Sequence, residues 1–164
     1  MIILLMGAAG AGKTTVGRLL ASDLGWDFAD ADDYHSPTNV DKMRNGIPLT
    51  DADRAPWLAS LRTLICSWIA AGRSAVLACS ALKQAYRDTL CVGPEVRIVY
   101  LKVAPEVLRQ RLRARHGHFM TEAMLASQLA TLEEPKDAVV IDASRSPAEI
   151  VADIEARLSL PKIR

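Results

Sequence analysis

The chain has 164 residues, enough for one domain of ordinary size with a single hydrophobic core. Half of its residues are hydrophobic and 24% are charged, and the formal net charge is only +1. This balance excludes the sustained positive field that non-specific nucleic-acid binding requires. No apolar run approaches the roughly 20 residues of a membrane span. We therefore expect a cytoplasmic protein without nucleic-acid or membrane partners.

Short apolar runs alternate along the chain with longer helical patterns. Continuous apolar runs are typical of strands that are buried on both faces, and a weaker strand is predicted at 26–29. Strand–helix alternation of this kind predicts a parallel sheet covered by helices on both faces, in one α/β domain that spans 1–164. The four strong strand segments are Ile2–Met6, Ala75–Cys79, Val96–Val103 and Ala138–Ile141.

Capping residues mark two helix starts. Thr50 with Asp53 resembles a capping box, and Ser146, Pro147 and Glu149 form a second start signal. The longest helical pattern follows Thr50 and places apolar residues on one face at spacings of three and four. These residues are Leu58, Leu61, Ile65 and Trp68.

The cysteines give no sign of a metal site or a disulfide framework. Cys66, Cys79 and Cys91 are odd in number, and none belongs to a pair with zinc-ligand spacing. All three lie in apolar surroundings, so we expect them to be buried and reduced.

A glycine-rich segment follows the first predicted strand and matches G-x-x-x-x-G-K-[ST] in full from Gly7 to Thr14. Glycines allow the backbone to turn tightly and to expose consecutive amide hydrogens, and the helix that starts near Lys13 adds its positive end. Lys13 is placed to reach the β and γ phosphates, and the Thr14 hydroxyl to coordinate Mg²⁺. The segment therefore predicts a P-loop that binds ATP with Mg²⁺. The predicted nucleotide-binding residues are Gly7, Gly10, Ala11, Gly12, Lys13, Thr14 and Thr15.

Two classes of protein other than a kinase are the alternatives for a chain with a P-loop: a GTPase switch and a scaffolding protein. A GTPase switch needs Asp-x-x-Gly, but none of the nine glycines has an aspartate three residues before it, and the Asn-Lys-x-Asp motif is missing. A scaffolding protein would have no use for an intact P-loop. The sequence therefore favours a small kinase of the nucleoside-monophosphate-kinase type.

Paired carboxylates follow the weak second strand. Asp30 and Asp32 are one residue apart at a strand end, so their side chains are expected to point the same way. One carboxylate would help to hold Mg²⁺ while the other orients an attacking hydroxyl. In isolation a solvated acidic turn would be the better explanation of such a pair, but its position about twenty residues after a P-loop reverses that preference and favours catalysis.

Cations are predicted around the transferring group, because phosphoryl transfer depends on positioning and on charge stabilisation. Four arginines at alternate positions within Arg109–Arg115 follow the fourth strand, and Arg111 and Arg115 share one helix face. Gly117 is placed to hinge a lid, approximately 111–135, over ATP. A solvated basic stripe remains the alternative for at least two of these arginines.

Further cations predict a pocket for a hydroxylated anion. Arg54 begins the long helix, and Lys83 and Arg87 lie four residues apart after the third strand. Each of them could be surface charge on its own. Together with His35 they suit a substrate that carries a carboxylate, which arginine binds with paired hydrogen bonds.

The sequence resembles the gluconate kinase (gluconokinase) family over nearly its whole length. The P-loop is shared by many families, but Asp53–Leu58 and Cys79–Lys83 are more specific blocks. The other matching segments are Asp30–His35, Asn39–Met43, Gly46–Arg54, Tyr86–Asp88, Gly117–Met120, Leu125–Gln128 and Leu132–Pro135.

The resemblance implies transfer of a phosphoryl group from ATP to D-gluconate, giving 6-phosphogluconate and ADP with Mg²⁺. It also implies a five-stranded parallel sheet in a three-layer P-loop kinase fold, and often a homodimer. Carried onto this chain, Thr14 and Asp30 hold the metal, and Asp142–Ser144 borders the adenine. The implied catalytic residues are Lys13, Asp32, Arg111 and Arg115, with Arg111 also contacting the nucleotide. The implied substrate-binding residues are Asp32, His35, Arg54, Ser80, Lys83 and Arg87.

Two alternatives stay open at this level. A shikimate-kinase-like or nucleotide-kinase-like enzyme would share the P-loop and the lid but would need different acceptor contacts. Gluconate and a closely related sugar acid such as idonate also differ only in one hydroxyl orientation, which leaves no clear mark in a sequence.

Overall fold

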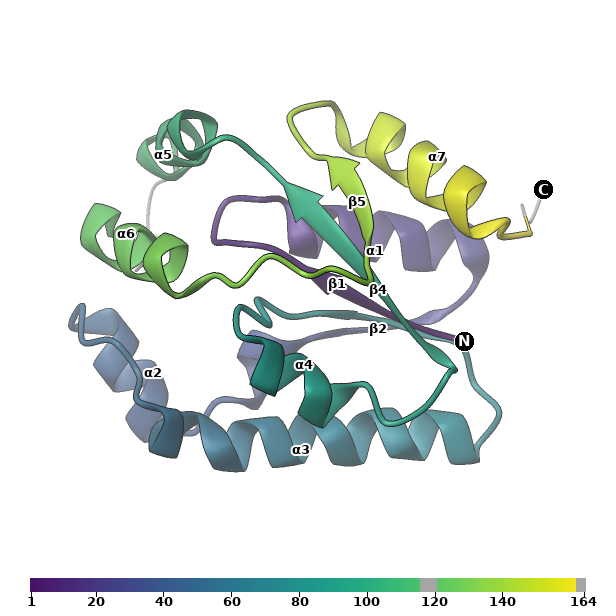
Figure 1. The fold of residues 1–164 in the computed structure, drawn as a ribbon, viewed down its shortest axis with the longest axis horizontal. Coiled ribbons are helices and arrows are strands. Elements are labelled where there is room, and N and C mark those ends of the chain that lie inside the picture. The colour runs from purple at the N-terminus through teal and green to yellow at the C-terminus, as the bar shows by residue number, and fades with distance from the viewer. Residues whose placement is uncertain (116–120, 162–164) are drawn as a thin grey trace.

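A central parallel sheet with helices on both faces dominates the computed structural model, which describes residues 1–115 and 121–161 (Figure 1). The sheet order is β2-β3-β1-β4-β5, and every neighbouring pair of strands is parallel. The expected three-layer α/β fold with five parallel strands is therefore confirmed. In chain order the elements are β1 (Ile2–Met6), α1 (Lys13–Leu24), β2 (Asp27–Asp30), the 3₁₀ turn η1 (Ala31–Tyr34), α2 (Pro37–Arg44), α3 (Asp51–Ala70), β3 (Ala75–Ala78), α4 (Gln84–Leu90), β4 (Val96–Lys102), α5 (Pro105–Arg113), α6 (Glu122–Thr131), β5 (Val139–Asp142) and α7 (Pro147–Leu158).

The central strand β1 contributes to two separate cores. Its alternate residues Ile3 and Leu5 pack with α1 and α7 on one face of the sheet. Ile2, Leu4 and Met6 pack with α3 and α4 on the other face. Both faces of β1 are thus covered, which explains why its sequence is continuously apolar rather than alternating.

The edges of the sheet differ from the expectation of fully buried strands. The predicted strand ends are correct to within one residue, but β5 is only partly buried and Val140 is 41% exposed. β2, at the opposite edge, is of intermediate exposure throughout. An edge strand has a neighbour on one side only, so a continuously apolar run is not by itself evidence that both faces are covered.

Helix starts agree with the predicted capping signals. Thr50 and Asp53 form a reciprocal capping box at the start of α3, and Ser146 and Glu149 form another at the start of α7. The four apolar residues predicted to form one face of α3 are all buried. The expectation that all three cysteines are buried holds only for Cys79: all three are free, but Cys91 is half-buried and Cys66 is exposed on α3, next to the buried Ile65.

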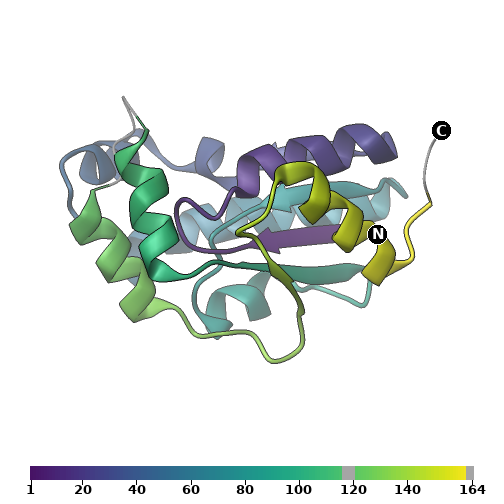
Figure 2. The ribbon, with the colours of Figure 1, turned by 90° about the horizontal axis from the view of Figure 1, so that it is seen from above.

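The elements that carry the predicted chemistry meet at one end of the sheet. The helices α2, α5 and α6 lie beyond the carboxyl ends of the strands, away from both chain termini (Figure 1). Seen from above, α5 and α6 lie together at that end, while α1 and α7 cover one face of the sheet (Figure 2). Ligands of open α/β sheets bind outside the carboxyl ends of the strands. Within the described residues, none of the helices combines the length and apolar character needed to span a membrane.

Candidate active site

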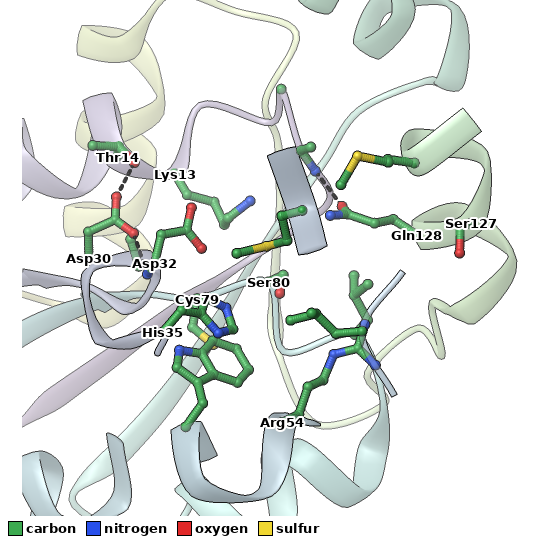
Figure 3. A pocket seen from close by; sticks show the side chains of 18 of the residues that line it. Lys13, Thr14, Asp30, Asp32, His35, Arg54, Cys79, Ser80, Ser127 and Gln128 are labelled. Atoms are coloured by element: carbon green, nitrogen blue, oxygen red, sulfur yellow. Dashed lines mark hydrogen bonds between the residues drawn. The ribbon is translucent and has the colours of Figure 1, made fainter. Parts of the chain in front are cut away.

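One pocket gathers side chains from the P-loop, the ends of β2 and β3, the helix α3 and the helix α6 (Figure 3). It also reaches the segment between α2 and α3, so most of the segments that carry the family resemblance contribute to its wall. The lining residues are Ala9, Gly10, Gly12, Lys13, Thr14, Thr15, Asp30, Asp32, His35, Met43, Ile47, Pro48, Leu49, Arg54, Trp57, Ala78, Cys79, Ser80, Leu82, Tyr86, Arg115, Met124, Ser127 and Gln128.

The P-loop backbone turns through two glycines in the left-handed region. Gly10 has φ 84° and Gly12 has φ 92°, values that side-chain-bearing residues rarely adopt. Gly12 is the N-cap of α1, so the loop leads directly into a helix N-terminus, the kind of site at which phosphate groups bind. Ala11, which was predicted to bind nucleotide, is 1% exposed and lies outside the pocket lining.

Lys13 lies across the loop from which it starts. Its ammonium donates to the carbonyl oxygens of Gly7 at 2.8 Å and Ala8 at 3.0 Å. Burial lowers the pKa of Lys13, and the negative charge of Asp32 opposes that shift. Gly7 itself lies outside the pocket lining and contributes through this carbonyl oxygen rather than through a surface for phosphate.

Two aspartates and a threonine hydroxyl form an oxygen-rich corner of the pocket. The Thr14 hydroxyl donates to Asp30 Oδ2 at 2.5 Å, and the backbone amide of Asp32 donates to Asp30 Oδ1 at 3.0 Å. Asp30 ends β2 and caps η1, so Asp32 stands in a 3₁₀ turn and not on the extended strand that the sequence predicted. Both Asp30 and Asp32 still line the pocket.

His35 is stacked against an aromatic ring in the pocket wall. Its imidazole stacks on Trp57 with ring centroids 4.3 Å apart, and the indole of Trp57 donates to the carbonyl of Ala31 at 2.7 Å. Burial, followed by the nearby charge of Arg54, lowers the pKa of His35 to about 4. The imidazole is therefore neutral at physiological pH, which suits contact with a hydroxyl better than with a carboxylate.

Arg54 belongs to a network at the rim of the pocket. Its guanidinium donates to the Tyr86 hydroxyl at 3.1 Å, and that hydroxyl donates to Asp51 at 2.5 Å. Lys83 also donates to Asp51, at 3.1 Å, and lies outside the pocket lining. The hydrogen bonds from Tyr86 and Lys83 lower the pKa of the Asp51 carboxyl. The structure thus brings Arg54 to the pocket, whereas the predicted substrate contact Lys83 pairs with an acid.

Arg87 has a structural role in place of the predicted substrate contact. Its side chain is 1% exposed and lies outside the pocket lining. The guanidinium donates to the carbonyl oxygens of Ala81, Leu82 and Glu133 at 2.7, 3.1 and 2.7 Å. Because these carbonyl oxygens already occupy the guanidinium, Arg87 fixes the loop after β3 and is not available to grip an acid.

The two predicted lid arginines separate. Arg111 donates to the carbonyl oxygens of Gly10 at 3.1 Å and Ala143 at 2.7 Å, so it joins the P-loop to the turn after β5. Arg111 lies outside the pocket lining, whereas Arg115 is part of it. The geometry therefore favours Arg115 over Arg111 as the cation that meets a transferring group. The predicted hinge Gly117 lies outside the described residues.

Sequence reasoning assigned no role to several residues of the pocket wall. Tyr86 and Gln128 both contribute polar groups, and both lie in blocks that carried the family resemblance. The sequence offered no signal beyond that membership, because each reaches the pocket through contacts with residues far away in the chain. Ser80, the predicted polar residue after β3, does line the pocket.

Comparisons with known proteins find relatives over most of the chain. A family model described as an AAA domain matches residues 2–135. A gluconokinase from Gluconobacter oxydans is 50% identical over 137 residues, which cover 82% of this chain and 76% of that protein. The solved structure of a gluconokinase from Sinorhizobium meliloti has a TM-score of 0.86 at 40% identity and covers 96% and 90% of the two chains. A shikimate kinase from Aquifex aeolicus has a TM-score of 0.61 at 18% identity, covering 97% and 96%, a likeness that shows the fold alone.

Proposed function

This chain belongs to the gluconokinase family, and from that membership we propose that its pocket transfers the terminal phosphoryl group of ATP to the 6-hydroxyl of D-gluconate. The observation that carries this function is the meeting of two halves in one pocket. A P-loop with its lysine forms the donor half, and a neutral histidine with an arginine–tyrosine network forms the acceptor half.

The donor half supplies a phosphate cradle. The backbone amides of Gly10, Gly12 and the first turn of α1 present donors to the phosphates, with the positive end of the helix behind them. Lys13 exchanges its bonds to the carbonyl oxygens of Gly7 and Ala8 for bonds to phosphate oxygens. The partial burial that lowers the pKa of Lys13 also strengthens that charge interaction, because it lowers the local dielectric constant.

Thr14 and Asp30 fit a magnesium site. Hydroxyl and carboxylate oxygens are the ligands that Mg²⁺ prefers, and in phosphoryl-transfer enzymes the phosphates and waters complete the shell. Within residues 1–115 and 121–161 no cluster of three or more His, Cys, Asp and Glu side chains forms a metal site. We therefore propose that Thr14 and Asp30 hold an Mg²⁺ ion that arrives with the nucleotide and offsets the negative charge of its phosphates.

The acceptor half orients the sugar acid. We propose that Arg54 binds the carboxylate, that His35 and Ser80 contact hydroxyl groups, and that Asp32 orients the 6-hydroxyl. The hydroxyl oxygen attacks the γ-phosphorus while the bond from phosphorus to the bridging oxygen breaks, and ADP leaves. Asp32 takes the hydroxyl proton. The transition state is loose, so positioning contributes more than strong base catalysis.

Arg115 stabilises the transferring group within a lid. We propose that approximately 111–135 closes over the nucleotide as part of one domain spanning 1–164, and that closure brings Arg115 onto the phosphoryl oxygens. Water is then excluded, which limits wasteful hydrolysis of ATP.

The assembly and location of the protein are further proposals. We propose a homodimer in the cytoplasm, acting on a free sugar acid without nucleic-acid or membrane partners. Size-exclusion chromatography with light scattering checks the dimer, and a monomeric mass at micromolar concentration would exclude it.

The function is tested by ADP release with Mg·ATP and a panel of acceptors: gluconate, idonate, shikimate, AMP and CMP, with a control that lacks acceptor. We expect turnover far above the control with gluconate. Turnover with shikimate or a nucleotide and none with gluconate would leave a P-loop kinase with a different acceptor. Comparable turnover with idonate would widen the substrate class to related sugar acids.

A further inference from the structure

A side chain of the helix α6 reaches the P-loop. The backbone amide of Ala9 donates to Gln128 Oε1 at 2.8 Å, across 119 residues of sequence. Both residues line the pocket. In Figure 3 the carboxamide of Gln128 points away from α6 toward the P-loop, on the side of the pocket where Lys13 lies.

The contact with Ala9 determines the orientation of the Gln128 carboxamide group. A backbone N–H only donates, so the Gln128 oxygen and not its nitrogen must face it. The NH₂ group, which carries two donors, is then directed elsewhere from the same carbon atom. In a pocket built to hold phosphates, the natural partner of that group is an anionic oxygen.

Capping and core packing of α6 hold the Gln128 side chain next to the P-loop. Met124 and Leu125 are buried, and Thr121 caps the helix by accepting from the amide of Met124. Leu125 packs in the same core cluster as β1 and α1, which flank the P-loop. Gln128 therefore projects from the part of the proposed lid that is already packed on the core. Being neutral, it adds a donor beside Lys13 without like-charge repulsion.

We propose that Gln128 is a catalytic residue that senses the γ-phosphate: its NH₂ group donates to a terminal phosphate oxygen of a bound nucleoside triphosphate while its oxygen stays on the Ala9 amide. The helix α6 thereby distinguishes a nucleoside triphosphate from a diphosphate. This inference rests on the nucleotide site of the proposed function but does not depend on gluconate as the acceptor.

The alternative role for the same contact is a latch. In that case Gln128 would only satisfy the Ala9 amide and hold α6 against the P-loop, and its NH₂ group would touch no phosphate. Two substitutions separate the roles. Gln128→Glu keeps an acceptor for Ala9, loses the donor and adds a negative charge, whereas Gln128→Met loses both the acceptor and the donor at similar volume and without added charge.

Binding without any acceptor is the direct test. The affinities of Mg·ADP and of the non-hydrolysable analogue Mg·AMPPNP are measured by calorimetry for the wild-type protein and both Gln128 variants. We expect the Kd for AMPPNP to rise about tenfold in Gln128→Met, the loss of one charge-assisted hydrogen bond, and further in Gln128→Glu. The Kd for ADP should stay within about twofold in Gln128→Met.

Matched controls and the contrary results make the test decisive. Gln110 is exposed on the neighbouring helix α5, so Gln110→Glu and Gln110→Met make the same chemical changes outside the pocket and should leave both affinities unchanged. Unaltered AMPPNP affinity in Gln128→Met, or equal changes for ADP and AMPPNP, would overturn the γ-phosphate contact. Unaltered affinity in Gln128→Glu alone would reduce Gln128 to a latch and overturn it too.

Two further measurements distinguish loss of the γ-phosphate contact from misfolding of a variant and from a wrong acceptor. Thermal unfolding of each variant shows whether it folds, and Gln128→Glu carries the test if Gln128→Met does not, because it retains the Ala9 acceptor. Turnover of the wild-type protein with gluconate is measured separately. Absence of that turnover would sink the proposed acceptor while leaving the triphosphate discrimination standing.

Discussion

Lys13 shows how a single residue is prepared for its ligand. Its ammonium bonds the carbonyl oxygens of Gly7 and Ala8, so the side chain already lies over the phosphate cradle. We expect Lys13→Ala to lower kcat by about a hundredfold or more, roughly 3 kcal/mol, as for the loss of one preorganised charge donor. ADP release in steady state measures this. Lys102→Ala, which removes an exposed ion pair, serves as the control, and near-normal turnover in Lys13→Ala would refute the P-loop assignment.

Arg54 is the predicted carboxylate contact that the structure brings to the pocket. We expect Arg54→Ala to raise the KM for gluconate about tenfold to a hundredfold, the range for a hydrogen bond to a charged group, and to leave the KM for ATP unchanged. Initial-rate kinetics in both substrates check the split. Arg62→Ala alters an exposed arginine of the same helix and should change neither constant. An unchanged gluconate KM in Arg54→Ala would show that the carboxylate lies elsewhere.

His35 gives the protein a pH dependence of known sign. Its pKa falls from an ordinary 6.5 to about 4 on folding, so the unfolded chain binds more protons between these values. The stability contributed by neutral His35 is complete above pH 6.5 and is lost as the pH falls toward 4. We expect the free energy of unfolding, measured in urea from pH 7 to pH 4, to fall less steeply in His35→Gln than in the wild-type protein. Parallel slopes would show that His35 titrates normally.

At the scale of elements, the loop after β3 depends on a buried cation. Ala81 has φ 45°, an unfavourable conformation for a residue with a side chain. The guanidinium of Arg87 donates to the carbonyl oxygens of Ala81 and of the next residue, Leu82. Glu133 is joined to the same loop, because its amide donates to Leu82 and its carbonyl accepts from Arg87. Through these bonds, Arg87 and Glu133 connect the loop after β3 to the segment that follows α6.

We expect Arg87→Met to lower the free energy of unfolding by about 3 kcal/mol, because the carbonyl oxygens of Ala81 and Glu133 lose their guanidinium donor and that of Leu82 loses one of its two donors. Urea unfolding followed by circular dichroism measures the loss. Arg97→Met, at an exposed position of β4, should change stability by less than about 0.5 kcal/mol. A substrate contact would behave in the opposite way, with an increased gluconate KM and unchanged stability.

Local elements of this chain were largely predictable from sequence. The capping boxes that begin α3 and α7 satisfy amides within three residues, so their signals are complete in a short window. Strand burial was less predictable. The apolar run of β5 resembles that of β1, yet Val140 is 41% exposed, because exposure depends on which elements cover the strand.

At the scale of the whole molecule, the nucleotide site couples ligand binding to stability. A ligand that binds only the folded state adds about 2.7 kcal/mol at a hundred times its Kd. For a chain of this length we therefore expect saturating Mg·AMPPNP to raise Tm by about 5 to 10 °C. Differential scanning fluorimetry measures the shift. Lys13→Ala should show a smaller one, and an unshifted wild-type protein would contradict nucleotide binding.

The sequence by itself determined the chemistry that is local. A P-loop needs glycines, lysine and threonine at fixed spacing within one turn, so Gly7–Thr14 could be identified without a structure. The alternation of elements likewise determined a parallel sheet between helices, because parallel strands need crossover connections. The family resemblance added the acceptor, which local physics does not reveal.

Only the tertiary structure decided which cations face the pocket. Arg54 and Arg115 line it, whereas Arg87 and Arg111 bond carbonyl oxygens of distant segments and Lys83 pairs with an acid. A guanidinium has the same chemistry in all four arginines, and its role is set by the acceptors that folding brings within reach. Those acceptors lie up to 101 residues away in sequence, so no local pattern records them.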